Sequence, residues 1–257
     1  MNLTIAELAK SLDDAAVLAR PVPQFASGTF DLTQAYEIQR SSIARRVARA
    51  DRVRGIKLGF TSRAKMMQMG VSDLIWGWLT ESMIEEEGGS VDLRRYIHPR
   101  VEPEVCFLTR RTIDRPITAL EALDYIEAVA PALEIIDSRY ENFKFTLEDV
   151  VADNCSSAGL VVGAWSRGFH ALSNAGVTVS FNGRPVLAGS TAAILGNPLR
   201  SLVQASRLLA DCNLSLPQGS LIMAGAATAA EPLMPCTHVQ CDINHLGRVE
   251  FLTGALA

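Results

Sequence analysis

Two short apolar stretches, HPRVEPEV at residues 98–105 and ALEIID at residues 132–137, carry three carboxylates between them. Successive side chains of a strand point to opposite faces, so Glu102 and Glu104 are predicted to project together, away from the valines that flank them. Glu134 has the same setting within its own predicted strand. Desolvating unpaired carboxylates is costly, and a shared divalent cation would remove that cost.

A site built from carboxylates alone offers only oxygen ligands. Such ligands suit Mg2+ or Mn2+, whereas zinc prefers histidine and cysteine. Glu102, Glu104 and Glu134 are therefore the candidate metal ligands. The alternative is that Glu102 and Glu104 lie on the solvated face of an edge strand, which Pro103 permits because proline cannot donate to a central ladder.

The composition indicates an ordinary globular chain. Its 257 residues are 48% hydrophobic, and 24 basic against 28 acidic residues give a net charge of -4 without a long basic run, so nucleic acid is not an expected partner. The five cysteines are odd in number and lie in apolar contexts, which indicates reduced thiols and a cytoplasmic protein. We expect neither a signal peptide nor a membrane span.

Helical periodicity marks the beginning of the chain. Apolar residues recur at helical spacing over residues 1–20 and 32–50, which predicts a helical N-terminal portion at residues 1–52. The basic end of the second helix is expected to be solvated; it carries Arg45, Arg46 and Arg49. Further on, Thr118 and Glu121 form a capping-box pattern that predicts a helix to about Ala130.

Strand and turn signals dominate after residue 52. Asn182-Gly183 between two apolar runs predicts a hairpin, and Asn197-Pro198 predicts the start of a helix that reaches about Asp211. Residues 219–225, 237–243 and 248–252 read as three more strands. Strands thus outnumber helices and come in hairpins, which predicts an α+β fold with a mixed or largely antiparallel sheet system in a single domain, residues 1–257.

Three other segments could contact a ligand. Lys57 lies in an apolar strand pattern, on a face shared with Gly55 and Gly59, so a ligand could approach its ammonium; the alternative is a lysine that extends to solvent. Burial can also lower the pKa of such a lysine enough for proton transfer. The polar loop DNCSSAG at 153–159 could hold a carboxylate or be a capped turn, and the small residues at 224–230 permit close approach.

A zinc-like spacing occurs near the C-terminus, at Cys236, His238, Cys241 and His245. In a strand, positions 236 and 238 share a face while position 241 points away, so four ligands would not converge. We expect core and turn roles for these residues.

Four segments taken together resemble the fumarylacetoacetate hydrolase superfamily. They are GIKLGFTSRAKMMQMGV (55–71), HPRVEPEVCF (98–107), LEIIDSRYENFKFTLEDVVADNCSS (133–157) and AGAATAA (224–230). Within that superfamily they resemble the branch of 2-hydroxypentadienoate hydratases and 4-oxalocrotonate decarboxylases, and the likeness runs over nearly the whole chain. It implies a mixed β-sandwich roll with N-terminal helices.

The resemblance also assigns site residues. It implies a Mg2+ or Mn2+ ion held by Glu102, Glu104 and Glu134, and it makes Lys57 the catalytic residue. The residues implied to contact the substrate are Lys57, Asn154, Ser156, Ser157 and Thr228. One position departs from the usual D-N-A-S-S pattern, because Cys155 stands where the family has alanine.

The resemblance implies one of two activities. Residues 136–154 are more similar to the decarboxylases, which indicates metal-dependent decarboxylation of 2-oxo-3-hexenedioate (4-oxalocrotonate) to 2-hydroxypenta-2,4-dienoate in meta-cleavage degradation of aromatic compounds. The alternative is a 2-hydroxypenta-2,4-dienoate hydratase, with Glu81 as a candidate acid or base. A metal-free scaffold subunit is a third hypothesis, against which the charged groups in apolar strands argue. The expected partners are a small 2-oxo dicarboxylate substrate, the pathway hydratase in a complex, and further copies of the chain.

Overall fold

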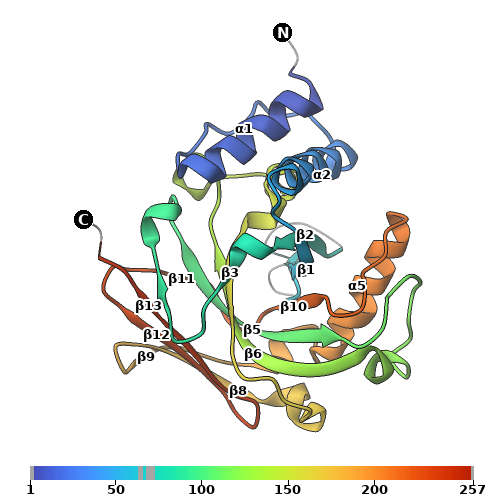
Figure 1. Ribbon diagram of the computed structural model, residues 1–257, viewed down its shortest axis with the longest axis vertical. Coiled ribbons are helices and arrows are strands. Elements are labelled where there is room, and N and C mark those ends of the chain that lie inside the picture. The colour runs from blue at the N-terminus through green and yellow to red at the C-terminus, as the bar shows by residue number, and fades with distance from the viewer. Residues whose placement is uncertain (1–2, 63–65, 68–72, 256–257) are drawn as a thin grey trace.

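The computed structural model describes residues 3–62, 66–67 and 73–255 (Figure 1). Part of the resemblance segment 55–71 therefore lies outside the described residues. The α-helices are α1 (Ile5–Leu18), α2 (Leu32–Ala48), α4 (Leu147–Ala152) and α5 (Leu199–Asp211). The strands are β1 (Val53–Gly59), β2 (Ile75–Thr80), β3 (Ile84–Glu85), β4 (Ser90–Val91), β5 (Arg100–Thr109), β6 (Ile126–Ile136), β7 (Ser157–Val162), β8 (Gly176–Phe181), β9 (Arg184–Ser190), β10 (Leu221–Ala226), β11 (Glu231–Pro232), β12 (His238–Ile243) and β13 (Gly247–Thr253).

The strands form two sheets within the described residues. The larger sheet has eight strands in the order β2-β1-β10-β5-β6-β7-β3, with β11 paired to β5, and the smaller has five in the order β4-β13-β12-β8-β9. Most neighbours are antiparallel, while β1 with β10, β3 with β7 and β4 with β13 are parallel. This mixed, curled arrangement with helices at the N-terminus confirms the predicted fold class (Figure 1).

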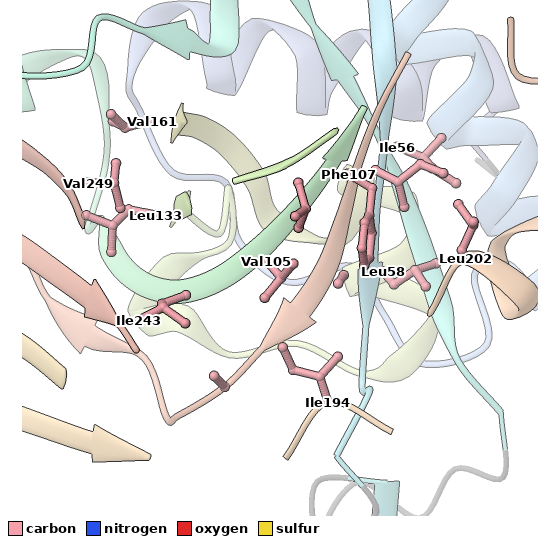
Figure 2. Packing of buried hydrophobic residues seen from close by; sticks show 14 of the residues in the cluster. Ile56, Leu58, Val105, Phe107, Leu133, Val161, Ile194, Leu202, Ile243 and Val249 are labelled. Atoms are coloured by element: carbon pink, nitrogen blue, oxygen red, sulfur yellow. The ribbon is translucent and has the colours of Figure 1, made fainter. Parts of the chain in front are cut away.

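The hydrophobic core lies between the sheets. Val105 and Phe107 of β5 and Leu133 of β6 belong to one buried cluster with Ile243 and Val249 of the smaller sheet, and Figure 2 shows Leu133 next to Val249. These are odd-numbered positions on β5 and β6, so strand alternation turns the even-numbered positions to the opposite face. That opposite face carries the three glutamates.

The N-terminal helices support the larger sheet. Each begins with a capping box, formed by Thr4 and Glu7 in α1 and by Asp31 and Gln34 in α2. On α2 the buried Gln39 side chain donates hydrogen bonds of 3.0 Å to the carbonyl oxygens of Trp76 in β2 and Val151 in α4. The helical portion is therefore tied to segments that border the candidate site.

The basic end of α2 is not simply solvated, contrary to the sequence expectation. Arg49 donates to both carboxylate oxygens of Asp13 at 2.7 Å, and Arg45 donates to the same carboxylate at 2.8 Å. The Asp13 side chain is fully buried between the helices, so these cations compensate its charge. The arginines join α1 to α2.

The predicted helix over residues 118–130 is wrong. Glu121 donates its backbone N–H to the Thr118 hydroxyl, but only a short 3-10 helix, Ala122–Tyr125, follows, and β6 then begins at Ile126. Pairing with β5 extends along β6 and passes through Pro131, which lies opposite Val105. The pairing of β6 with β5 thus overrides the helix-start signal at Thr118 and Glu121. By contrast, the hairpin at Asn182-Gly183 and helix α5 form as predicted.

The edge-strand alternative for Glu102 and Glu104 is also wrong, because β5 is paired on both sides, with β6 and with β10. A proline is tolerated in this central strand because Pro103 lies between the last β10 pair, Ala226 with Glu104, and the first β11 pair, Glu231 with Val101. The Pro103 carbonyl still accepts a hydrogen bond, from the N–H of Ala227 at 2.8 Å.

In the described part of the chain, no helix has the length and apolar character needed to cross a membrane.

Candidate active site

The three glutamates converge as strand alternation predicts. Glu102 of β5 lies directly opposite Glu134 of β6, and Glu104 is two residues further along the same face. One carboxylate oxygen from each lies within 4.8 Å of the others, and this is the only such cluster of three or more metal-binding side chains among the described residues. The side chains of Glu104 and Glu134 are buried, while Glu102 is half-buried.

The cluster has the properties of a cation site. Within the described residues, Oε1 of Glu104 and Oε1 of Glu134 are buried without a hydrogen-bond partner. Buried carboxylate oxygens are rarely left unsatisfied, and an oxygen-only donor set fits Mg2+ or Mn2+. The predicted ligand set therefore suits the implied metal.

One lysine faces the cluster. Lys57 of β1 is 4% exposed, and its Nζ donates to Oε2 of Glu134 at 3.2 Å, so the solvent-directed alternative is wrong. Burial alone would lower the pKa of Lys57, but the negative charges of Glu134 and its neighbours outweigh it and raise that pKa. The sequence predicted a lowered pKa for Lys57, whereas the pKa is raised in the protein without a bound cation. Lys57 is therefore a protonated ammonium.

Charge repulsion within the cluster shows in Glu104. Burial is the main cause that raises the pKa of Glu104 well above its usual range, and the neighbouring carboxylate of Glu134 adds to the rise. Lys57 and the Gly225 N–H, which donates to Oε2 of Glu104 at 2.8 Å, act in the opposite direction. A single ammonium among three carboxylates leaves negative charge that a divalent cation would neutralise.

The glycines beside Lys57 do not provide space for a ligand, contrary to the sequence expectation. A Cβ on Gly55 would meet the Leu221 carbonyl oxygen at 2.0 Å, and a Cβ on Gly59 would meet Cγ1 of Ile75 at 2.7 Å. These glycines instead allow β1 to pack closely against β10 and β2.

Access to Lys57 comes from a cavity of about 990 Å³ beside the cluster. Its lining includes Lys57, Glu102, Ser156 and Thr228, four of the residues that the sequence assigned to the site. Apolar side chains complete the walls, among them Phe60, Phe143, Phe145 and Val150. A small anionic substrate could thus reach both the ammonium and the carboxylate cluster.

Two of the predicted substrate-binding residues have other contacts. Oδ1 of Asn154 accepts from the Trp78 N–H at 2.7 Å, and Nδ2 of Asn154 donates to the Trp78 carbonyl at 2.9 Å. The Ser157 hydroxyl is buried and faces the sulfur of Met83. Neither residue is part of the cavity lining, whereas Ser156 is, and its buried hydroxyl lacks a partner among the described residues.

The loop that carries Ser156 is strained. Asn154, Cys155 and Ser156 have φ values of 50°, 53° and 57°, in the left-handed region. Each such residue costs on the order of 1–3 kcal/mol and persists where the surroundings enforce it. Here the enforcing contacts are the Asn154 amide bonds to Trp78 and the buried ion pair between Arg139 and Asp153. Asn154 thereby fixes the position at which Ser156 meets the cavity.

Cys155 is a packed, protonated thiol. Its Sγ donates to the Trp76 carbonyl at 3.0 Å, and burial is the main cause that raises its pKa to about 12. A thiol in this state is not a nucleophile near neutral pH. The Trp76 ring stacks on Tyr36 at a centroid distance of 5.6 Å, so it serves packing.

Sequence reasoning missed Arg100 and the aromatic wall. Arg100 lies within the quoted HPRVEPEV stretch and lines the cavity, and its position two residues before Glu102 already placed it on the same strand face. The wall residues Phe143 and Phe145 come from a loop after β6, where residues 142 and 143 have positive φ. No local pattern indicates that backbone conformation for a phenylalanine.

The zinc-like spacing does not form a cluster in the described residues. Cys236 is exposed, Cys241 is buried in the core, and Nε2 of His238 lies 3.4 Å from a carboxylate oxygen of Glu250. We expect Cys236→Ser and His238→Ala to leave the bound metal content unchanged, because neither side chain faces the glutamate cluster. Elemental analysis of the purified variants checks this, and loss of one metal equivalent in either variant would contradict it.

Comparison with known proteins agrees with this geometry. The model of the family described as fumarylacetoacetate (FAA) hydrolase C-terminal matches residues 52–251. The chain belongs to the fumarylacetoacetate hydrolase family. The match begins where the N-terminal helical portion ends.

Two relatives of this fumarylacetoacetate hydrolase family protein represent the two activities considered. A 4-oxalocrotonate decarboxylase of Pseudomonas sp is 54% identical over 252 residues, which cover 98% of each chain. A 2-keto-4-pentenoate hydratase of Paraburkholderia xenovorans (strain LB400) is 34% identical over 249 residues, covering 95% of this chain and 92% of the relative.

A solved structure has the same fold over nearly its full length. The 4-oxalocrotonate decarboxylase from Pseudomonas putida G7, complexed with magnesium and adipate, superimposes with a TM-score of 0.93 at 35% identity, covering 98% of each chain. The expected fold and its assignment to this family are confirmed.

Proposed function

We propose that this protein is a Mg2+- or Mn2+-dependent decarboxylase that converts 2-oxo-3-hexenedioate (4-oxalocrotonate) to 2-hydroxypenta-2,4-dienoate and CO2, in the meta-cleavage degradation of aromatic compounds. The observation that carries the proposal is the cluster of Glu102, Glu104 and Glu134 with Lys57 beside it, next to a cavity that Glu102 and Lys57 line. The name of the relative that is 54% identical supports the choice of substrate.

The reaction moves negative charge toward the cluster. The C6 carboxylate is related to the 2-oxo group as in a vinylogous β-keto acid. When the C5–C6 bond breaks and CO2 leaves, its electron pair forms the C4=C5 double bond. The C3=C4 pair then forms C2=C3, and the 2-oxo oxygen gains the negative charge. Glu102, Glu104 and Glu134 would hold a Mg2+ or Mn2+ ion, which would supply positive charge to stabilise the developing enolate. The site thus stabilises the end of the substrate at which charge develops.

Lys57 is placed to complete the product. The 2-hydroxy group needs one proton on the former 2-oxo oxygen, and the buried ammonium of Lys57 lines the cavity next to the metal ligands. We assign Lys57 as the donor of that proton and as a contact of the bound substrate. Its contact with Glu134 orients the ammonium before the substrate arrives.

Two hydroxyl groups complete the substrate-binding assignment. Ser156 and Thr228 line the cavity, and we assign the unpartnered Ser156 hydroxyl as a hydrogen-bond donor to the substrate carboxylate next to the oxo group. The Thr228 hydroxyl donates to the Ala229 carbonyl oxygen at 2.9 Å and would turn from it to contact the same carboxylate. Asn154 and Ser157 act indirectly, Asn154 through its amide bonds to Trp78 and Ser157 through its carbonyl oxygen, which accepts from Arg139 at 3.3 Å.

One observation favours decarboxylation over hydration. Adding water to the dienoate requires a positioned acid or base at the distal end of the substrate. Among the described residues that line the cavity, Glu102 is the only carboxylate, and it belongs to the metal cluster. Glu81, the candidate considered for hydration, is exposed and pairs with Arg54 at 3.3 Å outside the cavity lining.

Product analysis tests the proposed reaction. With Mg2+ present, purified protein should release CO2 from 2-oxo-3-hexenedioate, and it should not hydrate 2-hydroxypenta-2,4-dienoate to 4-hydroxy-2-oxopentanoate at a comparable rate. Trapped CO2 and the loss of dienoate absorbance measure the two reactions. Rapid hydration without CO2 release would make the hydratase alternative correct.

Three expectations from the sequence stay predictions. They are a cytoplasmic location, a complex with the pathway hydratase, and a homo-oligomer. The complex has a chemical rationale, because the dienol product is the substrate of that hydratase. Sedimentation of the protein alone and mixed with the hydratase tests both assemblies.

A further inference from the structure

A cation lies on the same strand face as the metal ligands. Arg100 is the first residue of β5, and period-two alternation places it in line with Glu102 and Glu104. Residues two apart in a strand are separated by about 6.6–6.8 Å. Arg100 lines the same cavity as Lys57 and Glu102, so a molecule bound at the cluster extends toward it.

Arg100 has no carboxylate partner among the described residues. In the part of the chain that the structure describes, Arg100 forms no salt bridge, and its guanidinium carbon lies 4.8 Å from the ring centroid of Phe143. An arginine over an aromatic face keeps its N–H groups available at the edge of the guanidinium plane. Half-buried and with no counter-ion in the described parts of the chain, it suits an anion that enters the cavity.

The ring beneath Arg100 is held by an unusual backbone. Asn142 and Phe143 have φ values of 59° and 56°, a conformation that is rare for a bulky residue such as phenylalanine. The Phe143 ring also packs against His98 and Phe145, with centroid distances of 5.1 and 5.6 Å. Strain of this kind is concentrated at functional sites, and here it places an aromatic support under the one arginine in the cavity lining that the structure describes.

We propose that Arg100 binds the distal carboxylate of the substrate, the group that leaves as CO2, and so selects dicarboxylates over monocarboxylates. The proposal rests on the proposed function for the identity of that carboxylate. Five C–C bonds in an extended six-carbon dicarboxylate span roughly 6 Å, comparable to the step from Glu102 to Arg100 along the strand. A guanidinium can hold a carboxylate through two parallel hydrogen bonds.

This contact has a distinctive kinetic consequence. As the C5–C6 bond breaks, negative charge leaves the distal carboxylate and moves to the 2-oxo end, so the attraction to Arg100 weakens in the transition state. The contact therefore stabilises the bound substrate more than the transition state. Loss of the contact should raise KM without lowering kcat.

Binding of two simple probes tests the contact without turnover. In the presence of Mg2+, the wild-type protein should bind adipate about tenfold or more tightly than hexanoate, which lacks the second carboxylate. Arg100→Gln should abolish that preference, and Arg100→Lys should restore part of it. Lys144→Gln is the matched comparison, because Lys144 is an exposed cation that also lines the cavity. Titration calorimetry gives the four affinity ratios.

Steady-state kinetics supplies the second readout. Arg100→Gln should raise KM for 2-oxo-3-hexenedioate about tenfold or more, with kcat unchanged or higher. An unchanged adipate preference in Arg100→Gln, its loss in Lys144→Gln instead, or a fall in kcat at constant KM would each overturn the assignment. Absence of CO2 release by the wild type would refute the proposed function. The preference for adipate over hexanoate would still show whether Arg100 binds a second carboxylate.

Discussion

Replacement of Glu104 by glutamine is expected to reduce decarboxylation by more than about 100-fold while the fold stays intact. The amide oxygen can still accept the hydrogen bond that the Gly225 N–H donates to Glu104. The substitution therefore removes one negative charge and preserves the shape of the side chain. Two carboxylates attract a divalent cation less than three do, so the loss should appear first in metal binding.

Thermal unfolding separates this effect from a folding defect. A cation that binds only the folded state raises the Tm, so added Mg2+ should stabilise the wild-type protein and should stabilise Glu104→Gln far less. Without Mg2+, the variant should be at least as stable as the wild type, because it lacks a buried carboxylate that repels Glu134. Glu87→Gln, at an exposed position, is the matched control and should keep both the Mg2+ response and activity. Full Mg2+-dependent activity of Glu104→Gln would exclude the metal assignment.

Strand alternation was sufficient to predict the core of the site. It placed Glu102 and Glu104 on one face of β5 and gave Glu134 an equivalent position on β6, and pairing of the two strands brings all three together. Local signals also predicted α1, α2, α5 and the hairpin, because caps and turns act over a few residues.

Contacts between distant segments explain what the sequence could not predict. Asn154 lies in a motif associated with the substrate, yet its amide is bonded to the backbone of β2, a partner 76 residues away in the sequence. The space beside Gly55 is occupied by the backbone of Leu221, and the space beside Gly59 by the side chain of Ile75. The sequence of β1 alone does not indicate either contact. The start signal at Thr118 failed for the same reason, because long-range pairing with β5 determined the structure of β6.

Replacement of Lys57 by alanine is expected to slow decarboxylation by about 100-fold or more, the usual scale for a lost proton-transfer group. The substitution removes the proposed proton donor to the 2-oxo oxygen and the cation that contacts Glu134. Metal binding should respond in the opposite way from Glu104→Gln. Because the ammonium and a divalent ion both interact with Glu134, the Lys57→Ala protein should bind Mg2+ at least as tightly as the wild type.

The conservative variant distinguishes the two roles of Lys57. Lys57→Arg retains a positive charge, but a guanidinium holds its protons too strongly to donate one readily. If Lys57 supplies the proton, Lys57→Arg should also be slow, with a Mg2+-dependent Tm rise like that of the wild type. If charge alone is needed, Lys57→Arg should recover most of the activity that Lys57→Ala loses. Full activity of Lys57→Ala in a protein that still binds Mg2+ would remove Lys57 from the reaction, and the proton would then have to come from water that reaches the cavity beside the three glutamates.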